Sequence, residues 1–127
     1  MFSVISVIDD DASIRAATKN LLSSHGYSVH TFVSAEDFLQ SAHWGDSSCV
    51  VADVQMSGMS GLDLLTHLRS RGNDVPFIFI TAFPDENLRA RALKIGAICF
   101  LSKPFAGPVL INHIELALNR TRGGAGK

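Results

Sequence analysis

Five short apolar segments recur along the chain, and between them apolar residues are spaced as on one face of a helix. The apolar segments cover residues 2–8, 27–32, 49–54, 77–80 and 98–101. The third and fourth, CVVADV and FIFI, are apolar at nearly every position, which is typical of strands buried on both faces of a parallel sheet. The pattern therefore predicts five strands, the second of which alternates more clearly between apolar and polar residues.

The stretches between these segments carry start and stop signals for helices. Asp11 can cap the first helix, which Gly26 ends, and Ser34 begins a second helix with a capping-box-like sequence. A third helix is expected from the leucines at 62–68, and a fourth from about residue 85 to residue 95. Pro108 suits the first turn of the last helix, because its missing N–H is harmless there.

Alternating strands and helices predict an α/β fold with a parallel sheet between two layers of helices. Right-handed crossovers leave few arrangements, and we expect the flavodoxin-like (βα)5 sandwich with strand order 2-1-3-4-5. Residues 1–120 should form this single domain. Residues 121–127, TRGGAGK, are Gly-rich and basic, and we expect them to form a flexible tail.

Composition fits one compact domain and excludes several classes of protein. The chain has 127 residues, 46% hydrophobic and 18% charged, which is enough apolar surface for a core and too little charge for a disordered protein. The net charge of −1 gives no general attraction to nucleic acid or to an anionic membrane. The periodic sequence is used up by one fold, so we expect no second, DNA-binding domain within these residues.

No targeting or membrane segment is visible in the sequence. Residues 1–8 are apolar but short and lack preceding basic residues, and nothing approaches the ~20 apolar residues of a membrane helix. Cys49 and Cys99 stand alone in apolar runs, which favours buried free thiols over a disulfide. These features together predict a cytoplasmic location.

Polar side chains follow four of the five predicted strands. Asp9 and Asp10 follow the first strand, Asp53 lies at the end of the third, Thr81 ends the fourth, and Lys103 follows the fifth. The carboxyl ends of parallel strands share one edge of a sheet, where ligands of such folds bind, so these groups should converge. Clustered carboxylates repel one another unless they share a proton or hold a cation. Oxygen ligands without a His or Cys cluster favour Mg²⁺ over zinc.

This set of groups suits the transfer of a phosphoryl group. Transfer requires positioning and neutralisation of the three equatorial oxygens, which Mg²⁺, Lys103 and the Thr81 hydroxyl could provide. A carboxylate can act as the nucleophile, giving an acyl phosphate. Asp53 fits this role best because it stands alone at a strand end, facing the acidic pair.

Several short motifs recur around the strand ends at a characteristic joint spacing. These are VIDDD at 7–11, Asp53, Met56, MSG at 59–61, Thr81-Ala82 and FLSKPF at 100–105. In this joint spacing the sequence resembles the receiver domains of two-component response regulators, over about residues 3–119, and is most similar to the FixJ subgroup. Members of this subgroup are often fused to a LuxR-type helix-turn-helix domain, which this sequence lacks.

The resemblance implies a role for each residue of the acidic site. Asp53 would accept a phosphoryl group from the phosphohistidine of a histidine kinase or phosphotransfer protein. Asp10 would bind Mg²⁺ directly together with Asp53, Asp9 would act through water, and the backbone carbonyl of Gln55 would complete the set.

The resemblance also implies a switch and its partners. Lys103 would pair with the phosphoryl group, and its bond to Pro104 would be cis. Thr81 would move toward the phosphoryl oxygen and Phe100 inward with it, changing the face of helix 4, strand 5 and helix 5. That face would bind an output protein or a second copy of the chain. The chain would therefore be a signalling module rather than an enzyme, without direct contact with nucleic acid.

Three departures from the family pattern bear on this expectation. Ser57 follows Met56, where the family usually has a Met-Pro pair, so the loop should be more mobile. The switch aromatic is Phe100 rather than Tyr and has no hydroxyl. The residues two beyond Asp53 and Thr81, which tune dephosphorylation in the family, are Gln55 and Phe83, and the bulky Phe83 suggests a hindered path for water.

The same residues allow three other interpretations, each of which fits the sequence less well. The acidic run could simply favour a helix N-terminus, but three adjacent acids exceed what one cap needs. A flavin-binding carrier of this fold needs a Ser/Thr/Gly-rich loop after the first strand, and the loop here is acidic. A hydrolase of the haloacid dehalogenase type resembles Asp-x-Asp-x-Thr after its first strand, whereas Asp53 lies on the third.

Overall fold

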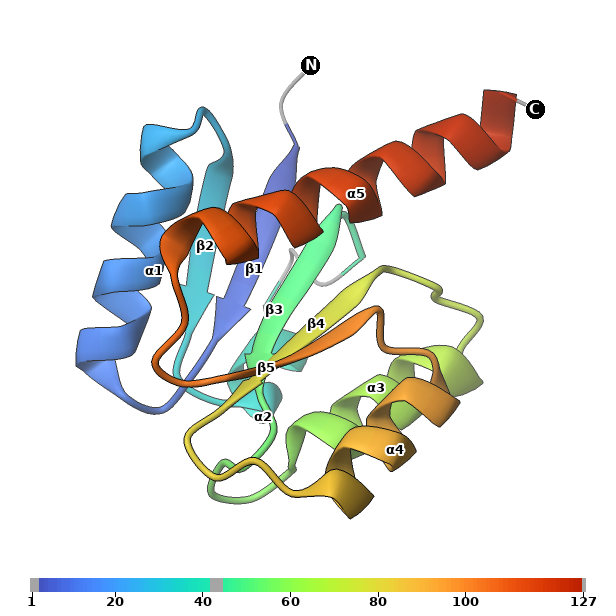
Figure 1. The fold of residues 1–127 in the computed structure, drawn as a ribbon. Coiled ribbons are helices and arrows are strands. Elements are labelled where there is room, and N and C mark those ends of the chain that lie inside the picture. Colours follow the sequence, from blue (N-terminus) through green and yellow to red (C-terminus); the bar gives the residue numbers. More distant parts are fainter. Residues whose placement is uncertain (1–2, 42–44, 127) are drawn as a thin grey trace.

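The computed structural model describes residues 3–41 and 45–126, which form one parallel five-stranded sheet with five helices (Figure 1). The strands are β1 Val4–Ile8, β2 Ser28–Phe32, β3 Cys49–Asp53, β4 Phe77–Thr81 and β5 Cys99–Ser102. The helices are α1 Ala12–Ser24, α2 Ala35–Gln40, α3 Gly61–Ser70, α4 Glu86–Ile95 and α5 Gly107–Gly126. The strand order is β2-β1-β3-β4-β5, so the predicted flavodoxin-like sandwich is confirmed.

The side chains of each strand alternate between two separate apolar clusters. In β4, Phe77 and Phe79 face the cluster under α2, α3 and α4, whereas Ile78 and Ile80 face the cluster under α1 and α5. Figure 1 shows the same division, with α1 and α5 on one side of the sheet and α3 and α4 on the other. Because both faces are covered, β3 and β4 are buried along their whole length.

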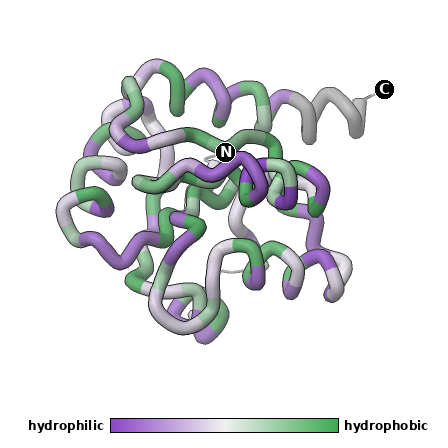
Figure 2. The backbone as a smooth tube through the Cα atoms, turned by 60° about the horizontal axis from the view of Figure 1, so that its bottom comes forward, coloured by the Kyte–Doolittle hydropathy of each residue, from purple (hydrophilic) through white to green (hydrophobic). Residues whose placement is uncertain are grey.

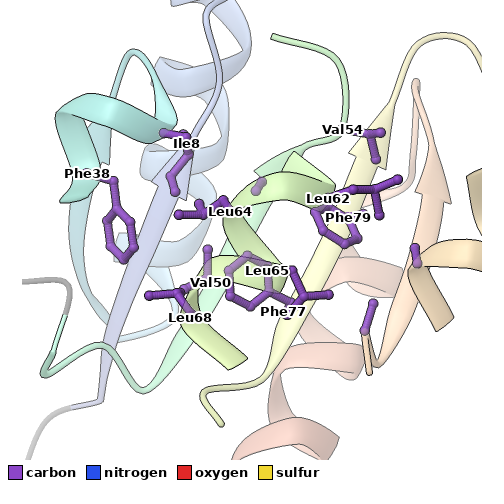
Figure 3. Packing of buried hydrophobic residues seen from close by; sticks show 14 of the residues in the cluster. Ile8, Phe38, Val50, Val54, Leu62, Leu64, Leu65, Leu68, Phe77 and Phe79 are labelled. Carbon is purple, nitrogen blue, oxygen red and sulfur yellow. The ribbon is translucent and has the colours of Figure 1, made fainter. Parts of the chain in front are cut away.

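The leucines of α3 form the centre of the first cluster. Leu64, Leu65 and Leu68 are fully buried and point at the sheet, where they surround Phe77 and Val50 (Figure 3). This packing fixes α3 against β3 and β4, the two strands that end in Asp53 and Thr81.

Local signals explain where the helices begin. Asp11 is the N-cap of α1, as predicted, and its carboxylate accepts from the N–H groups of Ser13 and Ile14. The full capping box is formed by Ser60 and Asp63 at the start of α3, which the sequence analysis did not identify. Hydrophobic and hydrophilic positions alternate along the helices, as expected where one face meets a core (Figure 2).

Helix α5 is longer than predicted. It extends to Gly126, whereas the domain was expected to end at residue 120. Once a helix is nucleated, each added residue contributes one further hydrogen bond, which can carry it through weak helix formers. The flexibility of residues 121–127 stays a prediction. None of the helices in the described part of the chain is both long and apolar enough to cross a membrane.

Candidate functional site

Four strand ends bring the predicted site residues to one edge of the sheet. Asp53 is the last residue of β3 and Thr81 the last of β4, while Asp9 and Lys103 directly follow β1 and β5. Neighbouring strands are in parallel register, with Ile8 beside Ala52 and Thr81 beside Ser102. The polar groups therefore meet because the strands that carry them end at the same height.

Lys103 connects the two buried carboxylates of the site. Its ammonium nitrogen lies 2.8 Å from Oδ2 of Asp9 and 3.0 Å from Oδ2 of Asp53. Asp9 is fully buried and Asp53 almost so. One cation between two carboxylates leaves the group with excess negative charge, to which the exposed Asp10 adds.

Backbone donors hold the other oxygen of each carboxylate. Oδ1 of Asp53 accepts from the N–H of Gln55 at 3.0 Å, and Oδ1 of Asp9 accepts from the N–H of Asp11 at 2.9 Å. The guanidinium of Arg15 in α1 donates to the backbone carbonyl of Asp9 at 2.7 Å. Both carboxylates are thereby fixed in orientation before any ligand arrives.

The surroundings of the site shift the pKa values of both Asp53 and Lys103. Burial raises the pKa of the Asp53 carboxyl above its usual value; the Gln55 N–H and Lys103 oppose this shift, and the charge of Asp9 adds to it. Burial lowers the pKa of Lys103, but its hydrogen bonds to Asp9 and Asp53, and their charges, outweigh burial, so the pKa is raised overall. Lys103 therefore stays protonated at neutral pH.

Three carboxylates offer oxygen ligands to a cation. One oxygen each from Asp9, Asp10 and Asp53 lies within 4.8 Å of the others. Two of these residues are buried and one is exposed, so the cluster faces the surface on the Asp10 side. Hard oxygen donors that leave one side open to water suit Mg²⁺, which keeps several of its waters in proteins.

Thr81 and Phe100 are the two residues of the expected switch. Thr81 is fully buried, and its hydroxyl oxygen accepts from the N–H of Phe83 at 3.1 Å. The backbone carbonyl of Thr81 accepts from the N–H of Lys103 at 2.7 Å, which ties the ends of β4 and β5 together. Phe100 is half-buried and packs against the cluster under α3 and α4. Phe83 is 70% exposed.

The peptide bond between Lys103 and Pro104 is cis, as the resemblance implied. Phe105, two residues after Lys103, packs against the cluster under α1 and α5. The segment after β5 is therefore attached to the opposite face of the sheet from Phe100.

Sequence reasoning treated Gly61 only as a loop residue, but it is part of the support of the site. A Cβ at this position would lie 2.5 Å from the carbonyl oxygen of Asp53 and 2.8 Å from Cε1 of Phe79. The N–H of Gly61 donates to the carbonyl of Val54 at 2.9 Å. The loop after Asp53 therefore comes back so close to the backbone of Asp53 that only glycine fits at position 61. The MSG motif at 59–61 was the one feature of the sequence that pointed to this glycine.

A groove that the sequence did not reveal opens beside the acidic cluster. It encloses about 560 Å³ between the loop after β3 and helix α4. Asp10 lines one end, Gln55 and Ser57 line the loop side, and Leu88 and Arg91 of α4 line the other side. The carboxylate cluster is therefore accessible from the α4 side of the sheet edge.

Residues 5–115 match the family model of the response regulator receiver domain. The chain belongs to the response regulator receiver domain family. The match favours this interpretation over the flavin carrier and the hydrolase, and it agrees with the carboxylate and lysine geometry at the strand ends.

Individual relatives point to the FixJ-like subgroup. The chain is 42% identical over 120 residues to the transcriptional regulatory protein TdiR of Thauera aromatica, covering 93% of this chain and 53% of that protein. It is 37% identical over 121 residues to the transcriptional regulatory protein FixJ of Bradyrhizobium diazoefficiens, covering 95% of this chain and 59% of that protein. The crystal structure of FixJ-N is similar with a TM-score of 0.84 and 33% identity, covering 94% of this chain and 95% of that one.

The chain spans about half the length of the curated relatives it matches. The shared part is the response regulator receiver domain, a component of two-component signalling.

Proposed function

We propose that Asp53 accepts a phosphoryl group from the phosphohistidine of a histidine kinase or phosphotransfer protein, with Mg²⁺ bound at the acidic cluster. The observation that carries this proposal is the contact of one ammonium group with two buried carboxylates, Asp9 and Asp53, at the sheet edge. A nucleophile next to a fixed cation is what an incoming anionic phosphoryl group requires.

The transfer step replaces one bond to phosphorus with another. A carboxylate oxygen of Asp53 forms a bond to phosphorus while the bond between phosphorus and the imidazole nitrogen breaks. The imidazole keeps the electron pair and takes up a proton. The Gln55 N–H and Lys103 hold the Asp53 carboxylate in one orientation, and Lys103 is close enough to share its charge with a phosphoryl oxygen.

The acidic cluster provides suitable ligands for Mg²⁺. Asp10, Asp53 and the backbone carbonyl of Gln55 would hold it directly, and Asp9 would contact it through water. When bound, Mg²⁺ neutralises carboxylate and phosphoryl charge. The Thr81 hydroxyl, which now accepts from the N–H of Phe83, still has its own hydrogen to donate to a phosphoryl oxygen.

We further propose that phosphorylation changes the face made by α4, β5 and α5. Movement of Thr81 would let Phe100 move inward, and Phe100 already lies half-buried on the α4 side of β5. Large apolar side chains are exposed on the two helices that border this face: Leu93 on α4, and Val109 and Leu116 on α5. They suit the binding of an output protein or of a second copy of the chain. The chain would act in the cytoplasm as a signalling module and not as a metabolic enzyme.

Phosphorylation by a small donor tests this function. Incubation with acetyl phosphate and Mg²⁺ should increase the mass of the protein by ~80 Da. The increase should disappear in Asp53→Ala and when a chelator removes Mg²⁺. No increase in the unchanged protein, or the same increase in Asp53→Ala, would contradict the proposal.

A further inference from the structure

The loop between β3 and α3 directly follows the proposed phosphorylation site and contains no proline. Gln55, whose carbonyl is a proposed ligand of Mg²⁺, lies two residues after Asp53. Ser57 occupies the position where the family usually has proline. A serine leaves φ unrestricted, so this loop loses a constraint that proline would provide.

A contact from another element restrains the same loop. Oε2 of Glu36 in α2 accepts from the backbone N–H of Met59 at 2.8 Å, across a separation of 23 residues. This N–H keeps the pKa of the Glu36 carboxyl below its usual value. Hydrogen bonds between an N–H group and a carboxylate are among the stronger ones that an exposed loop can form.

The Glu36 carboxylate occupies the space where a side chain at Gly58 would begin. A Cβ at Gly58 would lie 2.5 Å from Oε2 of Glu36, and Gly58 has a φ of +78°, which disfavours any other residue. Two independent features of the loop, an N–H at Met59 and a glycine at 58, thus fit one carboxylate.

Glu36 itself stands on a well-anchored element. The Ser34 side chain caps α2 by accepting from the N–H of Asp37 at 3.0 Å. Ala35 and Phe38, on either side of Glu36, are fully buried, and Phe38 contacts Phe32 with ring centroids 5.2 Å apart. The helix that carries Glu36 is therefore held in place, so its carboxylate can restrain the loop.

We propose that Glu36 is a positioning residue for the phosphorylation site, restraining the β3–α3 loop, which contains no proline of its own. By holding Gly58 and Met59, it limits the conformations of the loop and keeps the Gln55 carbonyl near Asp53. This role rests on the proposed function, because it concerns the loop that completes the cation site. Loss of the contact should weaken Mg²⁺ binding more than the transfer step itself.

Glu36→Gln compared with Asp37→Asn tests this role. Both residues are exposed on the first turn of α2, and both substitutions remove one negative charge, but only Glu36 contacts Met59. In Glu36→Gln, the Met59 amide should shift in ¹H–¹⁵N spectra and exchange its hydrogen faster. The dissociation constant for Mg²⁺ should rise about threefold to tenfold, at or below the usual effect of losing a group that supports a metal ligand.

Phosphorylation kinetics separate positioning from a general defect. With acetyl phosphate, Glu36→Gln should be slow at low Mg²⁺ and approach the unchanged protein at saturating Mg²⁺. Asp37→Asn should match the unchanged protein at both concentrations. Equal thermal melting of the two variants is expected, because both side chains are exposed.

The outcomes distinguish this role from the proposed function. If the unchanged protein is phosphorylated but Glu36→Gln and Asp37→Asn have the same Met59 amide and the same Mg²⁺ affinity, the role of Glu36 is wrong and the function stands. If the unchanged protein gains no phosphoryl group, the proposed function is wrong, and the role of Glu36 falls with it.

Discussion

The unit made of β3 and α3 differs sharply from the unit made of α4 and β5, although both help to enclose the same site. Every residue of β3 is buried, and α3 buries Gly61 and four leucines. In β5, by contrast, only Cys99 is buried, and among the described residues of α4 only Ala92 is. The two helices have the same length, 10 residues, so the difference lies in side chains rather than in size.

Under the proposed function, this difference would separate the elements that support the site from those that change when it is phosphorylated. Asp53 ends a strand that is buried along its whole length, which keeps its carboxylate in place. The α4–β5 unit holds Phe100 and has few buried contacts, so moving it requires little free energy. The proposed function, which needs a fixed nucleophile and a surface that can change, would benefit from this asymmetry.

The largest expected difference concerns the truncation of a leucine in each of the two helices. Leu65→Ala in α3 removes a fully buried side chain and should lower the free energy of unfolding by about 2–5 kcal/mol. Leu93→Ala in α4 removes a side chain that is 37% exposed and should change it by less than about 0.5 kcal/mol. Urea unfolding of both variants measures the contrast, and equal losses would contradict it.

A smaller effect is expected from adding a side chain at Gly61, where the start of α3 lies against the backbone of Asp53. Gly61→Ala places a methyl group against the Asp53 carbonyl and Phe79, and it should cost about 1–3 kcal/mol. It should also slow phosphorylation, because the backbone that moves is that of Asp53. Gly45→Ala is the control, since no atom lies within 4 Å of a Cβ there. A neutral Gly61→Ala would show that the β3–α3 unit is less rigid than its packing indicates.

The reactivity of the two cysteines provides a direct comparison of β3 with β5, because each strand contains one of them. Burial raises the pKa of the Cys49 thiol in β3 to about 12, so almost no reactive thiolate is present at pH 8. Burial also raises the pKa of Cys99 in β5, but the Phe100 N–H and the charge of Arg89 oppose that shift. With a disulfide reagent at pH 8, Cys99 should react at least about tenfold faster than Cys49. Cys99→Ser and Cys49→Ser assign the two rates, and similar rates would contradict the difference between the strands.

The smallest effect is expected on the surface of α4. Arg89 and Glu86 form an ion pair of 3.4 Å with both side chains exposed. Arg89→Gln should change the free energy of unfolding by less than about 0.5 kcal/mol, because exposed pairs are screened and lose side-chain entropy. Thermal unfolding checks this, and a loss above about 1 kcal/mol would mean that α4 is held more firmly than its burial suggests.

Much of the site was predictable because its position follows from the topology. Asp9, Asp53 and Lys103 each come at the end of a strand, so the order of apolar segments was enough to bring them together. The extra turns of α5 were not predictable from glycine content, since glycine weakens a helix but does not always end it.

Three features follow from the amino-acid pattern alone: the alternation of strands and helices, the strand ends that carry the acidic and basic groups, and the family to which they belong. They depend on local periodicity and on the rule that parallel strands end together. The folded chain was needed to show that one ammonium contacts both Asp9 and Asp53, that Gly61 has no room for a side chain, and that Glu36 holds Met59. Such contacts depend on distances between side chains far apart in the chain, which are set only when both faces of the sheet are packed.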